Sequence, residues 1–90
     1  MDPVISIGLP VYNDEEFISE TVNSILSQSF KYFELIIVDN HSEDGTYEIL
    51  KKFESDKRVK VYRNSENLGM YVNFNLAFKY WKSNYFMWAG

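Results

Sequence analysis

The sequence predicts an α/β domain built around a parallel sheet. Apolar segments of strand length alternate with amphipathic segments of helix length in the order β-α-β-α-β-α-β, and this alternation is typical of right-handed crossovers between parallel strands. Two of the apolar segments run directly into polar motifs, at residues 10–14 and 39–46. Because ligands bind beyond the carboxyl ends of parallel strands, the two motifs predict one site for a small polar ligand such as a nucleotide.

Residues 4–9 form the first expected strand, which is rich in β-branched residues and apolar enough to be buried on both faces. Pro10 is expected to end it. Asn13 is expected to cap the following helix, and Glu16 three residues later completes a capping-box pattern. This helix is expected to run to about Ser27. Its apolar face comprises Phe17, Ile18, Thr21, Val22, Ile25 and Leu26.

Residues 34–38 form the second expected strand, and a second helix begins at 44–46 and ends at 55–57. The buried stripe of this helix comprises Tyr47, Ile49, Leu50 and Phe53. The polar residues before it are expected to form a turn and a helix cap rather than catalytic groups; they are Ser42, Asp44, Gly45 and Thr46. Gly45 is expected to adopt a backbone conformation that other residues avoid.

Residues 58–63 alternate charged and apolar side chains, as a half-exposed edge strand does. A loop at 64–67 leads to a third expected helix at 68–82. The apolar face of that helix comprises Met70, Phe74, Ala77, Phe78 and Trp81. The fourth expected strand, 85–89, is strongly apolar and closes the sequence. We therefore expect residues 1–90 to be the amino-terminal part of a longer domain.

Composition excludes several classes of function. A net charge of -4 argues against a nucleic-acid partner. The absence of cysteine excludes disulfide and thiolate chemistry and fits a cytoplasmic location. The expected elements include no signal peptide and no transmembrane segment, although membrane association of a longer protein stays open. Neither a dinucleotide-binding Gly-x-Gly-x-x-Gly nor a P-loop is present. His41, the one histidine, is expected to be solvated and receives no role.

Four motifs, at 4–13, 24–30, 34–46 and 67–69, together resemble the opening of glycosyltransferase family two. The resemblance covers essentially the whole chain. It implies a Rossmann-like GT-A fold with three α/β/α layers, a four-stranded parallel sheet of order 3-2-1-4 and three crossover helices, truncated after the fourth strand. It also implies inverting transfer from a nucleotide-diphosphate sugar, usually uridine diphosphate (UDP)-linked, to a glycan or lipid-linked acceptor, commonly in polysaccharide biosynthesis.

The resemblance assigns the contact with the nucleobase to Asp39. Uracil presents an imide N–H, and an ionised carboxylate accepts from it in a charge-assisted hydrogen bond. The alternative from the residues alone is that Asp39 caps its own loop. Pro10, Val11 and Tyr12 match the segment that wraps the nucleoside, with Tyr12 offering its ring to the base. A half-buried packing role is the alternative for Tyr12.

Asn67 and Gly69 match the segment where the family approaches the nucleotide, and Gly69 is expected to let the backbone pass closely. The resemblance further implies a magnesium or manganese ion on the donor pyrophosphate and a carboxylate general base. Both sets of ligating and catalytic residues are expected after Gly90, so residues 1–90 are expected to contain no catalytic or metal-binding residue and to be inactive alone.

Three other functions compete with this interpretation. One is a non-catalytic, flavodoxin-like binding or interaction module. The second is a phosphorylation receiver, which needs an aspartate at the end of the third strand, where residues 61–64 offer none. The third is a nucleotidyltransferase, whose Gly-rich basic loop after the first strand is absent here.

Overall fold

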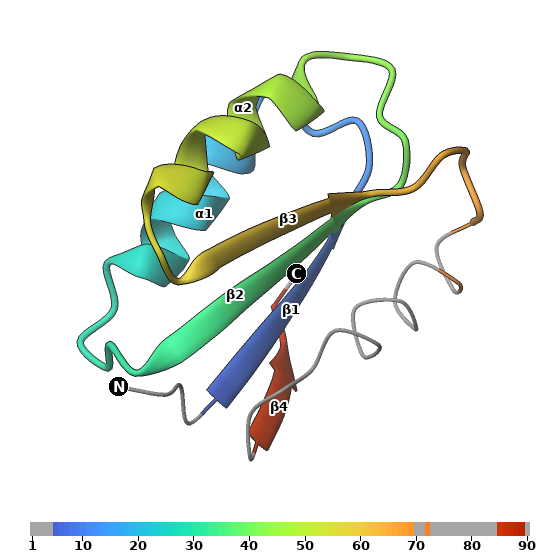
Figure 1. The fold of residues 1–90 in the computed structure, drawn as a ribbon. Helices are drawn as coiled ribbons and strands as arrows, with labels where there is room; N and C mark the ends of the chain where they lie inside the picture. The colour runs from blue at the N-terminus through green and yellow to red at the C-terminus, as the bar shows by residue number, and fades with distance from the viewer. Residues whose placement is uncertain (1–4, 70–71, 73–84, 90) are drawn as a thin grey trace.

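The computed structural model describes residues 5–69, 72 and 85–89 as a four-stranded parallel sheet with helices (Figure 1). The strands are β1 (Ile5–Val11), β2 (Phe33–Asp39), β3 (Val59–Arg63) and β4 (Tyr85–Trp88). Their order is β3-β2-β1-β4, and every pairing is parallel. This confirms the expected 3-2-1-4 sheet. The helices are α1 (Ile18–Leu26), α2 (Thr46–Lys52) and the short 3-10 helix η1 (Phe53–Ser55).

One face of the sheet is covered by α1 and α2, which lie side by side over the strands (Figure 1). The buried apolar cluster between these helices and the sheet contains alternate residues of the two central strands, because successive side chains of a strand point to opposite faces. Its members include Ile7, Leu9, Leu35 and Ile37 from the sheet and Ile18, Val22 and Leu50 from the helices. The predicted apolar faces of both helices are therefore confirmed in their centres. Phe17 is the exception, because it precedes α1 and is 55% exposed.

The opposite face of β2 is also buried, with Ile36 and Val38 almost fully inaccessible. Burial on both faces is typical of an inner strand of a parallel sheet and explains the unbroken apolar run of β2. Leu68 and Gly69 are not helical, contrary to the expected start of the third helix. Apart from Val72, residues 70–84 lie outside the described residues, so that helix stays a prediction. No helix in the described ranges is long and apolar enough to cross a membrane.

Pro10 lies inside β1 and does not end it, contrary to the sequence prediction. Backbone groups of alternate residues point to the same side of a strand, so Pro10 faces β4, as Gly8 does. The carbonyl of Gly8 accepts a hydrogen bond from the Ala89 N–H at 2.9 Å, and the described pairing with β4 ends at Trp88. The missing N–H of Pro10 therefore breaks no ladder hydrogen bond among the described residues.

The first helix begins four residues later than predicted, with Phe17 rather than Asn13 at the N-cap position. Asn13 is not its cap, because Asn13 has a positive φ of 48° and lies in a turn before the helix. The Asp14 carbonyl accepts from the N–H groups of Phe17 and Ile18, at 3.2 and 2.9 Å, and so starts the helical hydrogen bonding. The side-chain oxygen of Asn13 instead accepts a hydrogen bond from a residue far along the chain, described below.

The conformation predicted for Gly45 is wrong. Its φ is -80°, which any residue adopts. A Cβ atom at this position would lie only 2.6 Å from Glu15 Oε2. Gly45 thus makes room for a neighbouring side chain, and its conformation is ordinary.

Candidate functional site

The two polar motifs meet at the carboxyl edge of the sheet, as the sequence predicts. Val11 and Asp39 are partners in the β1–β2 register, so both strands end at the same level. One residue further, the Asn40 N–H donates to the Val11 carbonyl at 2.8 Å. The loops that follow, residues 12–17 and 40–45, therefore leave the sheet side by side.

The two loops are joined by direct hydrogen bonds. The Asn13 N–H donates to Ser42 Oγ at 2.8 Å, and Asn13 Oδ1 accepts from the Glu43 N–H at 2.8 Å. The Asp14 N–H donates to Thr46 Oγ1, also at 2.8 Å. These bonds satisfy backbone groups that a turn leaves without partners and hold Asn13 in its positive-φ conformation.

Asp44 and Glu15 extend this contact. Asp44 Oδ1 accepts from Thr46 Oγ1 at 2.5 Å and from the Thr46 N–H at 3.0 Å, while Oδ2 accepts from the Glu15 N–H at 3.3 Å. Desolvation alone would raise the pKa of Asp44. The hydrogen bonds from Thr46 and Glu15 together outweigh it, so the pKa of Asp44 lies below its ordinary value. The predicted turn before α2 is therefore present, and Asp44 accepts from the N–H of the first helical residue, although the N-cap position is Gly45 and has no side-chain cap hydrogen bond.

Asp39 is fully buried, and both carboxylate oxygens have partners inside the chain. Oδ1 accepts from the Ser42 hydroxyl, and Oδ2 accepts from the Ser42 N–H at 3.1 Å. The Arg63 guanidinium supplies a countercharge, with Nε 3.5 Å from Oδ2. Asp39 thus caps its own loop, which is the alternative that the sequence left open.

Arg63 joins three parts of the site. Besides the ion pair with Asp39, its Nη2 donates to the Ser42 carbonyl at 3.0 Å, and its guanidinium lies 4.7 Å from the centre of the Tyr47 ring. It is the last residue of β3 and pairs in register with Asp39. The sequence analysis missed Arg63. Its place at the end of an edge strand, level with two other strand-end motifs, is the signal that points to it.

A cluster of asparagines fixes the loop after β3. Asn40 Oδ1 accepts from Asn64 Nδ2 and from the Leu68 N–H, each at 2.9 Å. Asn40 Nδ2 donates to Asn67 Oδ1 at 2.8 Å, and the Gly69 N–H donates to the same oxygen at 2.8 Å. Sequence analysis singled out Asn67 but missed Asn40 and Asn64, which recur after consecutive strand ends.

Gly69 has a φ of 87°, and a Cβ atom there would meet nothing within 4 Å. The positive φ thus explains the glycine at this position. The expected reason was different, namely that a glycine lets the backbone pass close to the nucleotide. His41 also has a positive φ, 63°, and its Nδ1 lies 3.1 Å from the Asn64 carbonyl oxygen. His41 is therefore half-buried and packed against the loop after β3.

The predicted site residues all lie at the carboxyl edge, with different access to solvent. Tyr12 is 43% exposed, and Asn67 and Gly69 are exposed as well. Pro10 is half-buried, and Val11 and Asp39 are buried. Tyr12 is thus the exposed aromatic side chain among the predicted site residues.

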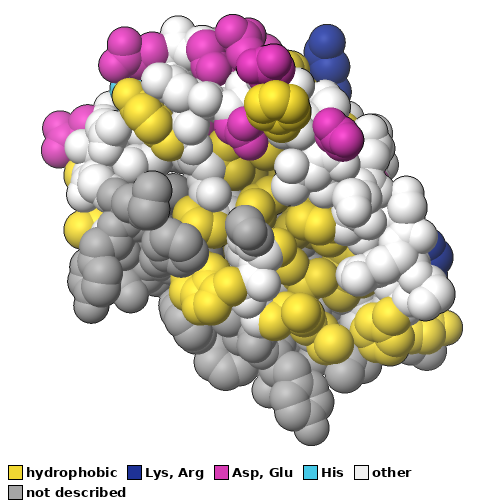
Figure 2. Space-filling view, turned by 180° about the vertical axis from the view of Figure 1, so that it is seen from behind, with side chains coloured by type: hydrophobic (Ala, Val, Ile, Leu, Met, Phe, Trp, Pro, Cys, Tyr) yellow, Lys and Arg dark blue, Asp and Glu magenta, His cyan; other side chains and the backbone are white. Residues whose placement is uncertain are grey.

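Acidic side chains gather at this end of the molecule (Figure 2). The two loops contribute Asp14, Glu15, Glu16, Glu43 and Asp44. Even so, no three His, Asp or Glu side chains in the described ranges converge on a point that could hold an ion. Asp44 and Glu15 already accept backbone and hydroxyl donors. The described residues therefore do not form a site for the expected divalent ion.

Comparison with known proteins identifies relatives of this chain. The sequence profile of Glycosyl transferase family 2 matches residues 6–89. The glycosyltransferase TuaG of Bacillus subtilis, whose name assigns it to teichuronic acid biosynthesis, is 43% identical over 76 residues, which are 83% of this chain and 30% of that protein. EpsE, a second glycosyltransferase of Bacillus subtilis, is 37% identical over 75 residues, which are 81% of this chain and 27% of that protein.

Solved structures share the fold. TarS of S. aureus superposes with a TM-score of 0.87 at 30% identity, covering 96% of this chain and 26% of the TarS chain. The same TarS region has been solved with UDP and with UDP-GlcNAc, with TM-scores of 0.88 and 0.84. The chain therefore spans less than a third of the length of these proteins.

Proposed function

This chain belongs to glycosyl transferase family 2, and we propose that it forms the part of an inverting glycosyltransferase that binds the donor nucleotide. The proposed donor is a UDP-linked sugar, and the acceptor is a glycan or a lipid-linked glycan. The UDP complexes of TarS, which is 30% identical over nearly the whole chain, support the choice of nucleotide. The teichuronic acid assignment of TuaG supports a role in polysaccharide biosynthesis.

The observation that carries this proposal is the position of Tyr12 relative to Asp39. Val11, just before Tyr12, pairs in register with Asp39, and Asn13, just after it, is hydrogen-bonded to Ser42 of the Asp39 loop. An exposed aromatic ring therefore adjoins a buried carboxylate. A ring that stacks on a base and a carboxylate that accepts from its edge are the two elements that recognition of a nucleobase requires.

The chemistry of the carboxylate favours uracil. An ionised carboxylate has about four lone-pair positions, and Asp39 uses three of them for the Ser42 hydroxyl, the Ser42 N–H and Arg63. The N3–H of uracil would occupy the fourth. Cytosine presents a lone pair at the same ring position and would be repelled. Because Asp39 is fully buried, base binding requires a local movement that exposes its carboxylate.

The other site residues have supporting roles in this proposal. The Val11 carbonyl already accepts from Asn40, so Pro10 and Val11 contribute mainly by fixing the direction in which Tyr12 leaves the sheet. Asn67 and Gly69 form the exposed rim of the same edge. We assign no described residue to the metal ion of the donor pyrophosphate and derive no step through it.

Binding selectivity tests the proposal. Isothermal titration should show that the chain prefers UDP to cytidine diphosphate, and Asp39→Asn should remove most of this preference. A charge-assisted hydrogen bond of about 2 kcal/mol corresponds to roughly a 30-fold preference. Circular dichroism should confirm that both proteins are folded.

Ser42→Ala is the matched control. It removes the hydroxyl that caps Asp39 but leaves the carboxylate, so it should lower thermal stability and keep the preference for uracil. If Asp39→Asn and Ser42→Ala change affinity equally for both nucleotides, Asp39 only caps its loop and the assignment is wrong. Absence of binding to a folded wild-type chain would contradict nucleotide binding altogether.

A further inference from the structure

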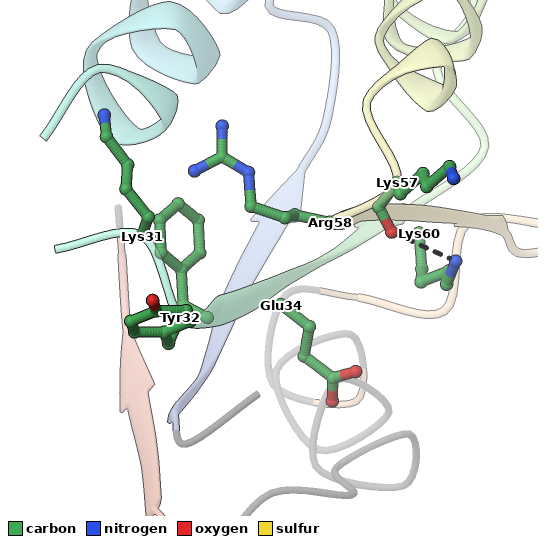
Figure 3. A pocket seen from close by; sticks show the side chains of 7 residues that line it. Lys31, Tyr32, Glu34, Lys57, Arg58 and Lys60 are labelled. Carbon is green, nitrogen blue, oxygen red and sulfur yellow. Dashed lines mark hydrogen bonds between the residues drawn. The ribbon is translucent and has the colours of Figure 1, made fainter. Parts of the chain in front are cut away.

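A basic pocket lies at the opposite edge of the sheet, where β2 and β3 begin (Figure 3). It has a volume of about 270 Å³ and is lined from two segments of the chain. Lys31, Tyr32 and Glu34 come from the start of β2, and Lys57, Arg58 and Lys60 come from the start of β3. Four of the nine basic residues of an acidic chain thus surround one pocket.

The three lysines form no ion pair among the described residues, although the pKa of Glu54 is lowered mainly by its hydrogen bond with Lys51 and to a smaller extent by the charge of Lys60. In the part of the chain that the structure describes, Lys31 Nζ and Lys60 Nζ donate to carbonyl oxygens, of Leu26 at 3.5 Å and of Lys57 at 3.4 Å. Within the described ranges, no carboxylate lies within 4.0 Å of Lys31, Lys57 or Lys60. Their ammonium groups are therefore available to an external anion.

Arg58 serves the fold and adds its charge to the pocket. It forms an ion pair with Asp56 at 2.8 Å, and its guanidinium lies 4.7 Å from the centre of the Phe33 ring. Its Nη2 also donates to the Leu26 carbonyl at 3.3 Å, at the carboxyl end of α1. The lysines, which form no ion pair with a carboxylate among the described residues, are the groups that would contact a ligand.

Two exposed aromatic rings adjoin the lysines. Phe30 and Tyr32 are 43% and 49% exposed, and their rings meet edge to face with centres 5.9 Å apart. Both flank Lys31 in the loop between α1 and β2. Exposed aromatic side chains beside lysines are typical of surfaces that enter the headgroup region of a membrane, because the rings partition into the interface while the lysines attract anionic lipids.

The acidic loops lie at the far end of the strands. The seven residues of β2 separate the two edges by about 20 Å, whereas the Debye length in physiological salt is about 8 Å. Repulsion between the acidic edge and an anionic membrane is therefore largely screened when the basic edge is in contact. The net charge of -4 does not prevent binding in this orientation.

We propose that the loop at residues 30–32 and the segment at 57–60 form a peripheral docking surface for anionic phospholipid headgroups. Lys31, Lys57 and Lys60 attract the lipid phosphates, and Phe30 and Tyr32 insert at headgroup depth. The carboxyl edge then faces away from the membrane, with Tyr12 open to solvent. This inference is independent of the nucleotide chosen above.

Vesicle sedimentation tests the proposal. The chain should bind vesicles of equal parts phosphatidylcholine and phosphatidylglycerol at physiological ionic strength, and it should not bind vesicles of phosphatidylcholine alone. Lys57→Gln with Lys60→Gln should weaken binding about fivefold for each lysine removed. Phe30→Ser with Tyr32→Ser should weaken it further and leave the salt dependence in place.

The matched control is Ser19→Glu with Ser65→Glu. Both residues are exposed and lie outside the pocket, and the pair changes the net charge by the same amount as the lysine variant. Equal loss of binding in both variants would show a net-charge effect and overturn the proposal. It would also be overturned if the wild-type chain did not bind anionic vesicles, or if inorganic phosphate at equal ionic strength displaced it.

Thermal melts and UDP titration of each variant keep the outcomes separate. Variants that melt as the wild type does and still bind UDP, but leave the vesicles, support the docking surface. If an acidic polypeptide binds the basic edge more tightly than the vesicles do, the partner is a protein and the membrane assignment is wrong.

Discussion

Thr46 links the loop after β1 to the start of α2 through its side-chain hydroxyl. Its side chain is fully buried, and its hydroxyl accepts from the Asp14 N–H at 2.8 Å while donating to Asp44 Oδ1 at 2.5 Å. Thr46→Val keeps the shape of the side chain and removes both hydrogen bonds. It therefore isolates the contribution of this contact to the stability of the site.

The expected cost follows from these two bonds. A buried N–H left without an acceptor costs about 1 to 3 kcal/mol, and the Asp14 N–H is only partly buried, which places its share in the lower half of that range. Asp44 loses a second, charge-assisted bond but keeps the one from the Thr46 N–H at 3.0 Å. We expect a total loss of about 2 kcal/mol, which for a domain of this size lowers Tm by roughly 8 to 16 °C.

Thermal and urea unfolding followed by circular dichroism measure this loss. Thr46→Ser keeps the hydroxyl and should cost only about 1 kcal/mol for the missing methyl group. Thr21→Val, on a half-exposed position of α1, should change stability by less than about 0.5 kcal/mol. If Thr46→Val melts within a few tenths of a degree of the Thr21→Val protein, the loops are not held together by these bonds.

Four further variants test other contacts. The pKa of Asp56 is lowered mainly by its hydrogen bond with the Arg58 side chain, which outweighs desolvation. The resulting stabilisation is present above the unfolded pKa of 3.8 and is lost as the pH falls through the lower folded pKa. Asp56→Asn should therefore cost less than about 1 kcal/mol at neutral pH, and its urea midpoint should fall less in acid than that of the wild type. Gly69→Ala should cost about 1 to 2 kcal/mol because of its positive φ, whereas Gly45→Ala should cost less because only a flexible glutamate must move. Arg63→Met should cost about 2 kcal/mol in urea unfolding, discounted for its partial exposure, and an unchanged midpoint would show that the buried carboxylate needs no countercharge.

The strands and helices were predictable because their signals are local. The apolar run of β2 and the spacing of Ile18 and Val22 on α1 identify buried surfaces without any knowledge of their partners. The order of the strands is different, since no local pattern encodes which strand lies beside which. That order came from the resemblance to a family, and the structure confirms it.

The boundaries that were wrong depend on partners far along the chain. Asn13 is a residue type that often caps helices, but its side-chain oxygen accepts a hydrogen bond from the Glu43 N–H, thirty residues away. Pro10 usually ends a strand, but here it faces a side where the described pairing has already ended. At position 45 a glycine is favoured because a Cβ atom there would lie too close to the Glu15 side chain. In each case the local preference was real, and a tertiary contact outweighed it.

The location of the site was predictable, and its internal support was not. Strand ends mark the carboxyl edge, so Tyr12 and Asp39 were found from the sequence alone. Arg63 and Asn40 were missed because their roles arise from hydrogen bonds that cross between loops more than twenty residues apart. A search for polar residues at the end of the third strand as well would have found Arg63, whereas Asn40 already lay in the motif after the second strand.

The central claim is that the carboxyl edge of the sheet receives the nucleoside. The most direct test is a titration of the isotopically labelled chain with UDP, followed through the backbone amide signals in nuclear magnetic resonance spectra. We expect shifts at residues 11–13, 40–42 and 67–69, with residues 31–34 and 57–60 unchanged. Shifts confined to the amino edge, or none in a folded chain at saturating UDP, would contradict it.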